Sequence, residues 1–269
     1  MRVRAPGSSA NLGPGFDVLG LAVARYVWAD DEGRGEPCGP EHIARIAYEA
    51  AGGAEAIWFD FELPPGRGLG FSAAARAAGA MLAKLQQGHP FAEAQRLAYP
   101  VVADIEGHGD NAAPCVFGGL HVIAGDVNHR IARPMPGNLL FWVPDMETWT
   151  DHSRAALAAS VDRADAVFNL GRVGLLIAAV YEQRLDLLAT ATQDRLHQPS
   201  RFVDCEPSAK AYEIALQAGA SAAWLSGSGP TVAVVVDDVT KPVVVDALGE
   251  SGEVLDLATD ETGAIPVPD

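Results

Sequence analysis

Cysteine and basic residues are scarce in this sequence, and each scarcity argues against a class of protein. Three cysteines, Cys38, Cys115 and Cys205, stand far apart, with no CxxC pair and no histidine at zinc-ligand spacing. Disulfide scaffolding and structural zinc are therefore not expected. Only 19 basic residues stand against 35 acidic ones among 269, for a formal net charge of −16. Because such a charge repels nucleic-acid backbones and anionic lipid surfaces, we expect neither partner.

Long hydrophobic runs are missing as well. No stretch of roughly 18 uninterrupted apolar residues is present, so no membrane-spanning segment is expected. Residues Met1–Pro6 lack the apolar core of a signal peptide, and a cytoplasmic location follows by default. With 49% apolar and 20% charged residues, the composition is that of a globular protein whose length allows one large domain or two packed lobes.

The sequence does have a glycine-rich stretch, PPGRGLGFSAA at residues 64–74, followed by an alanine-rich amphipathic run. Its glycines let backbone N–H groups approach an anion closely, and the following residues can start a helix whose positive dipole end faces the same anion. The stretch matches neither the Walker A nor the dinucleotide GxGxxG pattern. Taken alone, a plain strand-to-helix turn explains it equally well.

Short β-like runs alternate with helical stretches, which predicts a mixed α and β protein. Glycines and prolines in the loop 6–15 are expected to forbid regular structure there. The last quarter follows a ferredoxin-like order of helix, strand, turn, strand, helix and strand. The punctuation at 134–137 marks a boundary between lobes at 1–135 and 136–269. Strands are expected at 2–5, 18–27, 57–63, 120–124, 139–143, 220–225, 231–236 and 254–257, and helices at 40–51, 72–85, 92–106, 153–160, 164–181, 185–193, 208–218 and 241–248.

Three further segments carry polar groups beside glycines. Ala5–Gly20 presents an amide and a carboxylate, and Glu106–Pro114 packs four hydrogen-bonding or ionisable side chains into six positions. Ser226–Val232 lies between two β-like runs, where glycine lets a backbone come close to another group. With the glycine-rich stretch, these segments in this order resemble the small-molecule kinases of the GHMP superfamily. The first and second resemble the homoserine kinases in particular, and the likeness extends from Arg2 to Ala264.

The resemblance implies an α+β, two-lobed GHMP kinase fold, with a ribosomal-protein-S5-like N-terminal lobe and a ferredoxin-like C-terminal lobe. It also implies ATP and Mg²⁺ in the cleft between them and phosphate transfer to the hydroxyl of L-homoserine, a step of threonine synthesis. Ser72 and Glu106 match the family's magnesium ligands, a hydroxyl and a carboxylate suited to a hard cation. A homodimer is left open. The nucleotide-binding positions are Pro64, Gly66, Arg67, Gly68, Leu69, Gly70, Phe71, Ser72 and Ala73.

The same resemblance implies a site for a zwitterionic acceptor. Guanidinium groups at Arg154 and Arg201 would clamp its carboxylate, and Asp17 would take its ammonium group. Asn11 and Asn111 would orient the attacking hydroxyl, and they form the implied catalytic set together with Ser72 and Glu106. The acceptor-binding positions are Asn11, Asp17, His108, Asn111, Thr150, Arg154 and Arg201.

No carboxylate base is evident, because Asn111 stands where mevalonate-type kinases hold an aspartate. The implied mechanism is direct in-line transfer by positioning and charge stabilisation. Asp110 is a rival base on chemical grounds, although a role in capping its own turn is favoured. His108 is kept only as a substrate contact.

The sequence departs from the family at Phe71, where the first of two serines is usual, and in the shortened stretch 28–39, which corresponds to part of the adenine pocket. Arg67 could offset the lost hydroxyl by contacting phosphate, or could simply face solvent. Two alternatives therefore stay open: a kinase for another small hydroxy acid or amino alcohol, and a non-catalytic relative that only binds a ligand. Because both predicted metal ligands, Ser72 and Glu106, are retained, the non-catalytic alternative is disfavoured.

Overall fold

Two long strands, β1 (Arg2–Ala10) and β2 (Leu19–Asp30), form the base of the first lobe in the computed structural model, which describes residues 1–146, 154 and 157–268. The expected irregular loop over 6–15 is wrong for its first half, because β1 continues to Ala10. A register shift between Pro6 and Gly7 absorbs the irregularity in the pairing with β2. The antiparallel sheet has the order β11-β1-β2-β4-β3, with β5 on β2 and β6 on β5; the added strands are β3 (Glu36–Pro37), β4 (Trp58–Phe61), β5 (Leu120–Ala124), β6 (Val127–Ile131) and β11 (Ile265–Val267).

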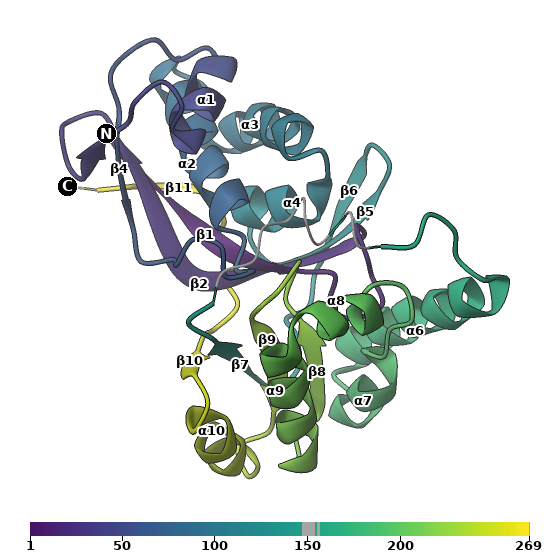
Figure 1. The fold of residues 1–269 in the computed structure, drawn as a ribbon. Helices are drawn as coiled ribbons and strands as arrows, with labels where there is room; N and C mark the ends of the chain where they lie inside the picture. Colours follow the sequence, from purple (N-terminus) through teal and green to yellow (C-terminus); the bar gives the residue numbers. More distant parts are fainter. Residues whose placement is uncertain (147–153, 155–156, 269) are drawn as a thin grey trace.

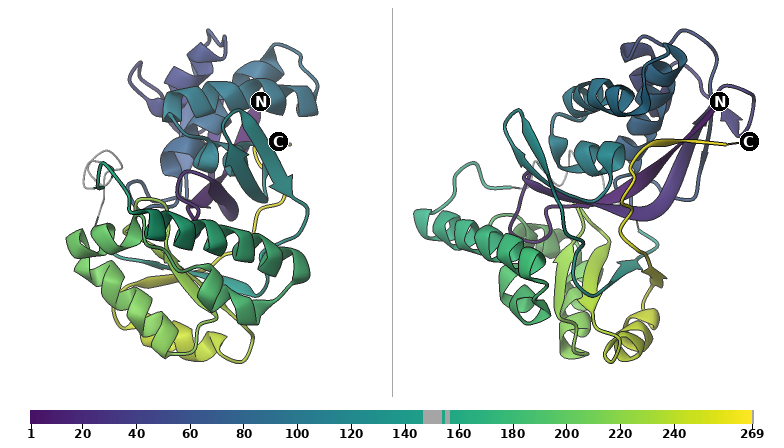
Figure 2. Two further views of the ribbon diagram at one scale, coloured as in Figure 1. Left: turned by 90° about the vertical axis from the view of Figure 1, so that its right-hand side faces the viewer. Right: turned by 180° about the vertical axis from the view of Figure 1, so that it is seen from behind.

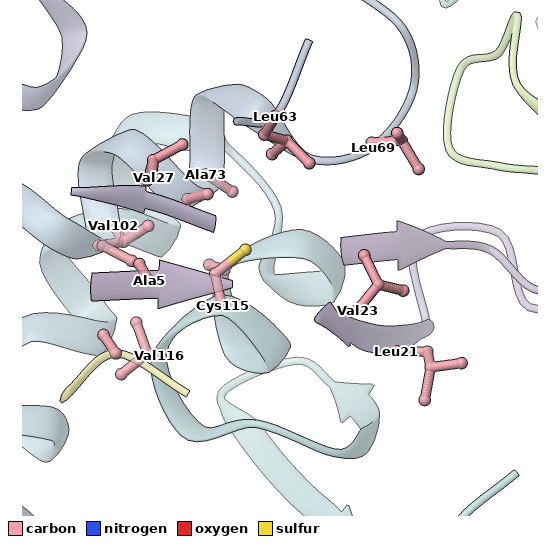
Figure 3. Close-up of a cluster of buried hydrophobic side chains, with 14 of the residues drawn as sticks. Ala5, Leu21, Val23, Val27, Leu63, Leu69, Ala73, Val102, Cys115 and Val116 are labelled. Atoms are coloured by element: carbon pink, nitrogen blue, oxygen red, sulfur yellow. The ribbon is translucent and has the colours of Figure 1, made fainter. Parts of the chain in front are cut away.

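Four helices cover one face of this sheet (Figure 1). The alanine-rich run forms the central helix, α2, whose small side chains are almost all buried against its neighbours and against β1. Figure 3 shows the core between sheet and helices, where Ala5 of β1 and Val27 of β2 meet Val102 of α3 and Cys115 of α4. The helices are α1 (Ile43–Ala50), α2 (Phe71–Gln86), α3 (Phe91–Glu106) and α4 (Gly109–Phe117).

The second lobe is a four-stranded antiparallel sheet of order β10-β7-β9-β8 with helices on both faces. Alternation along β7 explains this: Leu140 and Trp142 pack with α9 and α10, whereas Leu139 and Phe141 face the core shared with α6 and α7. The predicted ferredoxin-like order is confirmed. The strands are β7 (Asn138–Val143), β8 (Ala222–Leu225), β9 (Val232–Val236) and β10 (Glu253–Asp256); the helices are α6 (Arg163–Glu182), the short 3₁₀ helix η1 (Leu185–Leu187), α7 (Leu188–Ala191), α8 (Gln198–Asp204), α9 (Glu206–Gln217) and α10 (Lys241–Gly249).

Several elements differ from the sequence expectation. The helix expected at 185–193 is split into η1 and α7, and 157–160 is not helical; most of the rest of 153–160 lies outside the described residues. The strands β3, β6 and β11 and the helices α4 and α8 were not expected. The last strand, β11, pairs with β1 (Figure 2), so a lobe division at 135/136 assigns to the second lobe a strand that belongs to the first sheet.

Helix α6 is the one described helix whose length and mean hydropathy of 1.4 would suffice to cross a membrane, and 22% of that stretch is buried. It is tied to the rest of the molecule by a buried amide. Asn169 donates to the carbonyl oxygen of Pro14 at 3.0 Å and to the carboxylate of Asp194 at 2.6 Å. The helix is therefore anchored to the segment that follows β1.

Candidate active site

The glycine-rich stretch connects β4 to α2, and two distant segments hold it. The backbone N–H of Ser8 donates to the carbonyl of Leu69 at 2.9 Å, and the hydroxyl of Ser226 donates to the carbonyl of Gly68 at 2.6 Å. A Cβ on Gly68 would lie 2.5 Å from the Ser226 carbonyl oxygen, and one on Gly70 would lie 2.0 Å from the Ser8 hydroxyl. Both glycines also have a positive φ. Three of the four segments singled out in the sequence are thus brought into contact.

Helix α2 begins directly after this loop, with Gly70 as its N-cap, and no described side chain caps it. Its first intrahelical bond runs from the N–H of Ala74 to the carbonyl of Gly70, at 2.9 Å. The N–H groups of the first turn, Phe71 to Ala73, are therefore available to an anion at the positive end of the helix dipole. This is the arrangement expected for the phosphates of a nucleotide.

The ring of Phe71 packs against β4. It makes edge-to-face contacts with Phe59 and Phe61, with ring centroids 6.0 and 5.4 Å away. Arg67 does not simply face solvent, because its guanidinium group donates to the carbonyl of Asp145 at 2.7 Å. Phe71, where the loop departs from the family pattern, and Arg67, which could offset that departure, thus both have contacts within the protein.

The residues predicted to hold magnesium, Ser72 and Glu106, come together across helices α2 and α3. Between them lies a side chain that the sequence reasoning missed. Nη1 of Arg76 donates to the hydroxyl of Ser72 at 2.6 Å and to the carboxylate of Glu106. The Glu106 side chain is 9% exposed and that of Arg76 18%. The signal available in the sequence was the four-residue spacing that places Ser72 and Arg76 on one face of the helix.

The donor atoms at this position fit a magnesium ion. One hydroxyl and one carboxylate oxygen lie within hydrogen-bonding distance of the same nitrogen, and both are oxygen ligands of the kind Mg²⁺ prefers. Within the described residues there is no group of three or more His, Cys, Asp or Glu side chains that could hold a metal. An ion at this position would take its other ligands from phosphate and water, as Mg²⁺ usually does with nucleotides.

Helix α4 begins beside Glu106 and carries two of the predicted acceptor contacts. His108 Nδ1 lies 2.6 Å from the carboxylate of Asp110, which also accepts from the backbone N–H of Asn111 at 3.0 Å. The hydrogen bond with Asp110 raises the pKa of His108 above its ordinary value, against the opposite effect of burial. The Asp110 carboxylate is thus engaged within its own turn. The amide oxygen of Asn111 accepts from the hydroxyl of Ser8 at 2.9 Å.

Asp17 and Arg154, predicted to bind opposite ends of the acceptor, are paired with each other. Both terminal nitrogens of Arg154 lie 2.8 Å from the carboxylate oxygens of Asp17. Asn11 holds Asp17 in place: its amide oxygen accepts from the Asp17 N–H at 3.1 Å, and its amide nitrogen donates to the Gly227 carbonyl at 3.0 Å. The second hydrogen of this amide nitrogen has no partner among the described residues, so it can bind a ligand.

Arg201 lies on α8, and only 5% of it is exposed. Its Nη1 donates to the carbonyl of Gly227 at 2.9 Å, and its Nε has no partner among the described residues. The guanidinium groups of Arg201 and Arg154 lie 5.4 and 5.3 Å from the ring centre of Phe16. Burial and the charge of Arg154 lower the pKa of Arg201 to about 10. Two cations and an unpartnered buried donor favour an anionic ligand.

A second missed residue, His197, positions Arg201. Its Nδ1 lies 3.0 Å from Nη1 of Arg201, and its Nε2 lies 2.8 Å from the carbonyl of Gly13. Because the first contact needs an acceptor and the second a donor, the ring is neutral with its proton on Nε2. Burial lowers the pKa of His197, in agreement with the neutral form. Thr150, also predicted as an acceptor contact, lies outside the described residues.

Comparison with known proteins places this geometry in a family. The model of the GHMP kinases N terminal domain matches residues 40–119, and the model of the GHMP kinases C terminal domain matches residues 176–254. A homoserine kinase from Desulfitobacterium hafniense is 34% identical over an alignment of 280 positions, gaps included, which covers 94% of each chain. The chain belongs to the homoserine kinase family of the GHMP kinases. A homoserine kinase from Deinococcus radiodurans is 37% identical over an alignment of 295 positions, gaps included, which covers 98% of this chain and 95% of that one.

A solved structure of a homoserine kinase, from Cytophaga hutchinsonii, supports the fold of this family member. It superposes with a TM-score of 0.84, covering 98% of this chain and 96% of that chain at 24% identity. The predicted two-lobed GHMP kinase fold is therefore confirmed. In this homoserine kinase family member, the glycine-rich stretch lies inside the N-terminal match and the Ser226 turn inside the C-terminal one.

Proposed function

We propose that the protein transfers the terminal phosphate of ATP to the side-chain hydroxyl of L-homoserine, forming O-phospho-L-homoserine for threonine biosynthesis. The observation that carries this proposal is the Asp17–Arg154 pair. It offers a carboxylate and a guanidinium group in direct contact, which complements an ammonium and a carboxylate group on one carbon atom. When an α-amino acid binds, the Asp17–Arg154 ion pair would be replaced by two ion pairs, one between Asp17 and the ammonium group and one between Arg154 and the carboxylate group of the amino acid.

The acceptor carboxylate would bind Arg154 and the unpartnered Nε of Arg201, while its ammonium group would bind Asp17. The neutral ring of His197 fixes Arg201 without adding a competing charge. Asn111 and the remaining amide hydrogen of Asn11 would direct the hydroxyl of the side chain towards the donor. A zwitterion with a short hydroxyl arm is thus bound group by group, which is the chemistry of homoserine.

The donor phosphates would bind at the start of α2, where backbone N–H groups of the first turn meet the dipole of the helix. Ser72 and Glu106 would hold Mg²⁺, which when bound neutralises charge on the transferring phosphoryl group. We assign the nucleotide contacts to Pro64, Gly66, Arg67, Gly68, Leu69, Gly70, Phe71, Ser72 and Ala73.

Of the carboxylates described near the acceptor positions, Asp17 is paired with Arg154 and Asp110 is held in its own turn, so neither is placed to act as a base. Phosphoryl transfer proceeds through a loose transition state and depends mainly on positioning and charge stabilisation. Asn11 and Asn111 would supply the positioning, and Ser72 with Glu106 the metal. We also infer a cytoplasmic location, with homodimer formation left to a measurement of mass in solution.

A coupled assay of ADP release, with homoserine, threonine, serine and pantoate offered separately, tests this function. Turnover of homoserine well above the others is the expected result. Preferential turnover of another acceptor would replace homoserine but keep the kinase chemistry. Binding of homoserine without turnover, under any nucleotide and metal tested, would contradict the proposed reaction and favour a ligand-binding role.

A further inference from the structure

A positively charged side chain of the protein, the guanidinium group of Arg76, lies between Ser72 and Glu106. Nη1 of Arg76 contacts both oxygen groups, and these two contacts are the hydrogen bonds that its guanidinium group makes among the described residues. Its Nε is buried and has no partner there. The side chain is thus held in place by the same two groups that would hold a metal ion.

Charge explains why the arginine lies there. The carboxylate of Glu106 is almost fully buried, and a carboxylate removed from water needs a positive partner close by. Arg76 supplies that partner as long as no metal is bound. A divalent ion at the same oxygens would lie within contact distance of the guanidinium group, and two cations that close repel each other strongly in a site largely closed to water.

We infer that Arg76 is a built-in competitor of the divalent cation: its guanidinium group occupies the Ser72–Glu106 position in the metal-free protein and must leave before both oxygens can bind the ion. The inference rests on the proposed magnesium site. Arg76 lies one helical turn after Ser72, close to the start of α2 where the donor phosphates would bind. The displaced guanidinium group meets negative charge there, so nucleotide and metal bind cooperatively and the metal alone binds weakly.

Replacing Arg76 with methionine tests this inference, because methionine keeps most of the side-chain length and removes the charge. Binding of Mn²⁺ is measured by electron paramagnetic resonance, first without nucleotide and then with a non-hydrolysable ATP analogue. Without nucleotide, Arg76→Met is expected to bind Mn²⁺ roughly tenfold or more tightly than the unmodified protein, because no guanidinium group opposes the ion. The increase in Mn²⁺ affinity caused by the ATP analogue should shrink in the same variant.

Two further variants show whether the effect is local. Arg96→Met removes an exposed arginine of α3 that donates a hydrogen bond to the Ala92 carbonyl of its own helix, so it should leave Mn²⁺ affinity unchanged. In Glu106→Gln/Arg76→Met the carboxylate is gone, and the gain in affinity should disappear. Thermal unfolding gives an independent readout, because Mn²⁺ should raise the Tm of Arg76→Met more than that of the unmodified protein.

Equal or weaker Mn²⁺ binding by Arg76→Met would overturn the inference, as would the same gain in Arg96→Met. Should Arg76→Met fail to fold, Arg76→Gln carries the same test, since an amide can still bond to Ser72 without a charge. None of these measurements involves homoserine or turnover. A wrong assignment of the acceptor would therefore leave this result unchanged, and a wrong assignment of Arg76 would leave the acceptor assay unchanged.

Discussion

Replacement of Arg154 by methionine separates acceptor binding from folding. The Asp17–Arg154 pair is substantially exposed, with side chains 33% and 42% accessible. Exposed ion pairs contribute only about 0–1 kcal/mol to the free energy of unfolding, so the variant should keep its fold and its Tm within a few degrees. The substrate carboxylate, in contrast, would lose charge-assisted hydrogen bonds worth about 1.5–3 kcal/mol.

That loss corresponds to a rise in the KM for homoserine of roughly 10- to 150-fold, with the KM for ATP changed little. Steady-state kinetics with each substrate varied at saturation of the other gives both constants. Arg184→Met is a matched control, because Arg184 makes a similar two-contact pair with Asp186 on the exposed surface and should leave both constants unchanged. Equal rises in the two KM values, or a Tm lowered far more than in the control, would refute the role given to Arg154.

Three other substitutions test the remaining parts of the site. Gly70→Ala places a Cβ 2.0 Å from the Ser8 hydroxyl and should lower kcat/KM for ATP by roughly 100-fold. Gly125→Ala is the control, because Gly125 also has a positive φ but has open space around it, and it should leave kcat/KM unchanged. Equal losses in the two variants would show that the backbone conformation alone matters. Phe71→Ser restores a hydroxyl beside the donor phosphates and should lower the KM for ATP, at a loss of about 1 kcal/mol in stability from the broken aromatic contacts; an unchanged KM would show that the hydroxyl is irrelevant. The pKa of His108 is raised above its ordinary value of 6.5 in the folded protein, so its contribution to stability is fully present below that pH and is lost as the pH rises through the folded value. The difference in unfolding free energy between the unmodified protein and His108→Gln should therefore shrink as the pH is raised above 6.5, and a constant difference would contradict the assigned contact.

Much of the fold follows from local pattern. Helix α2 was expected within one residue of its observed ends, because alanines and leucines recur at helical spacing directly after the glycine-rich loop. The path of β1 through Pro6 could not be read in the same way, since proline and glycine in a strand are tolerated only where the pairing partner adjusts its register. That adjustment depends on β2 and is not encoded within the segment itself.

The site shows the same division. Ser72, Glu106, Asp17 and Arg154 were found because their types and order match a family pattern. The bond from Arg201 to the carbonyl of Gly227 depends on α8 packing beside a turn 26 residues away along the chain. The position of Arg76 between the two predicted metal ligands was not predicted, because it depends on a contact with Glu106, which is 30 residues away. Pairings of this kind arise only when the elements are assembled.

The position of β11 has a consequence for how the two lobes can move. The chain leaves the first sheet after β6, forms the whole second lobe, and returns to pair beside β1. The lobes are therefore joined by two covalent crossings, which oppose free rotation about a single linker. Probes on β1 and β11 would report the melting of the sheet that contains both strands.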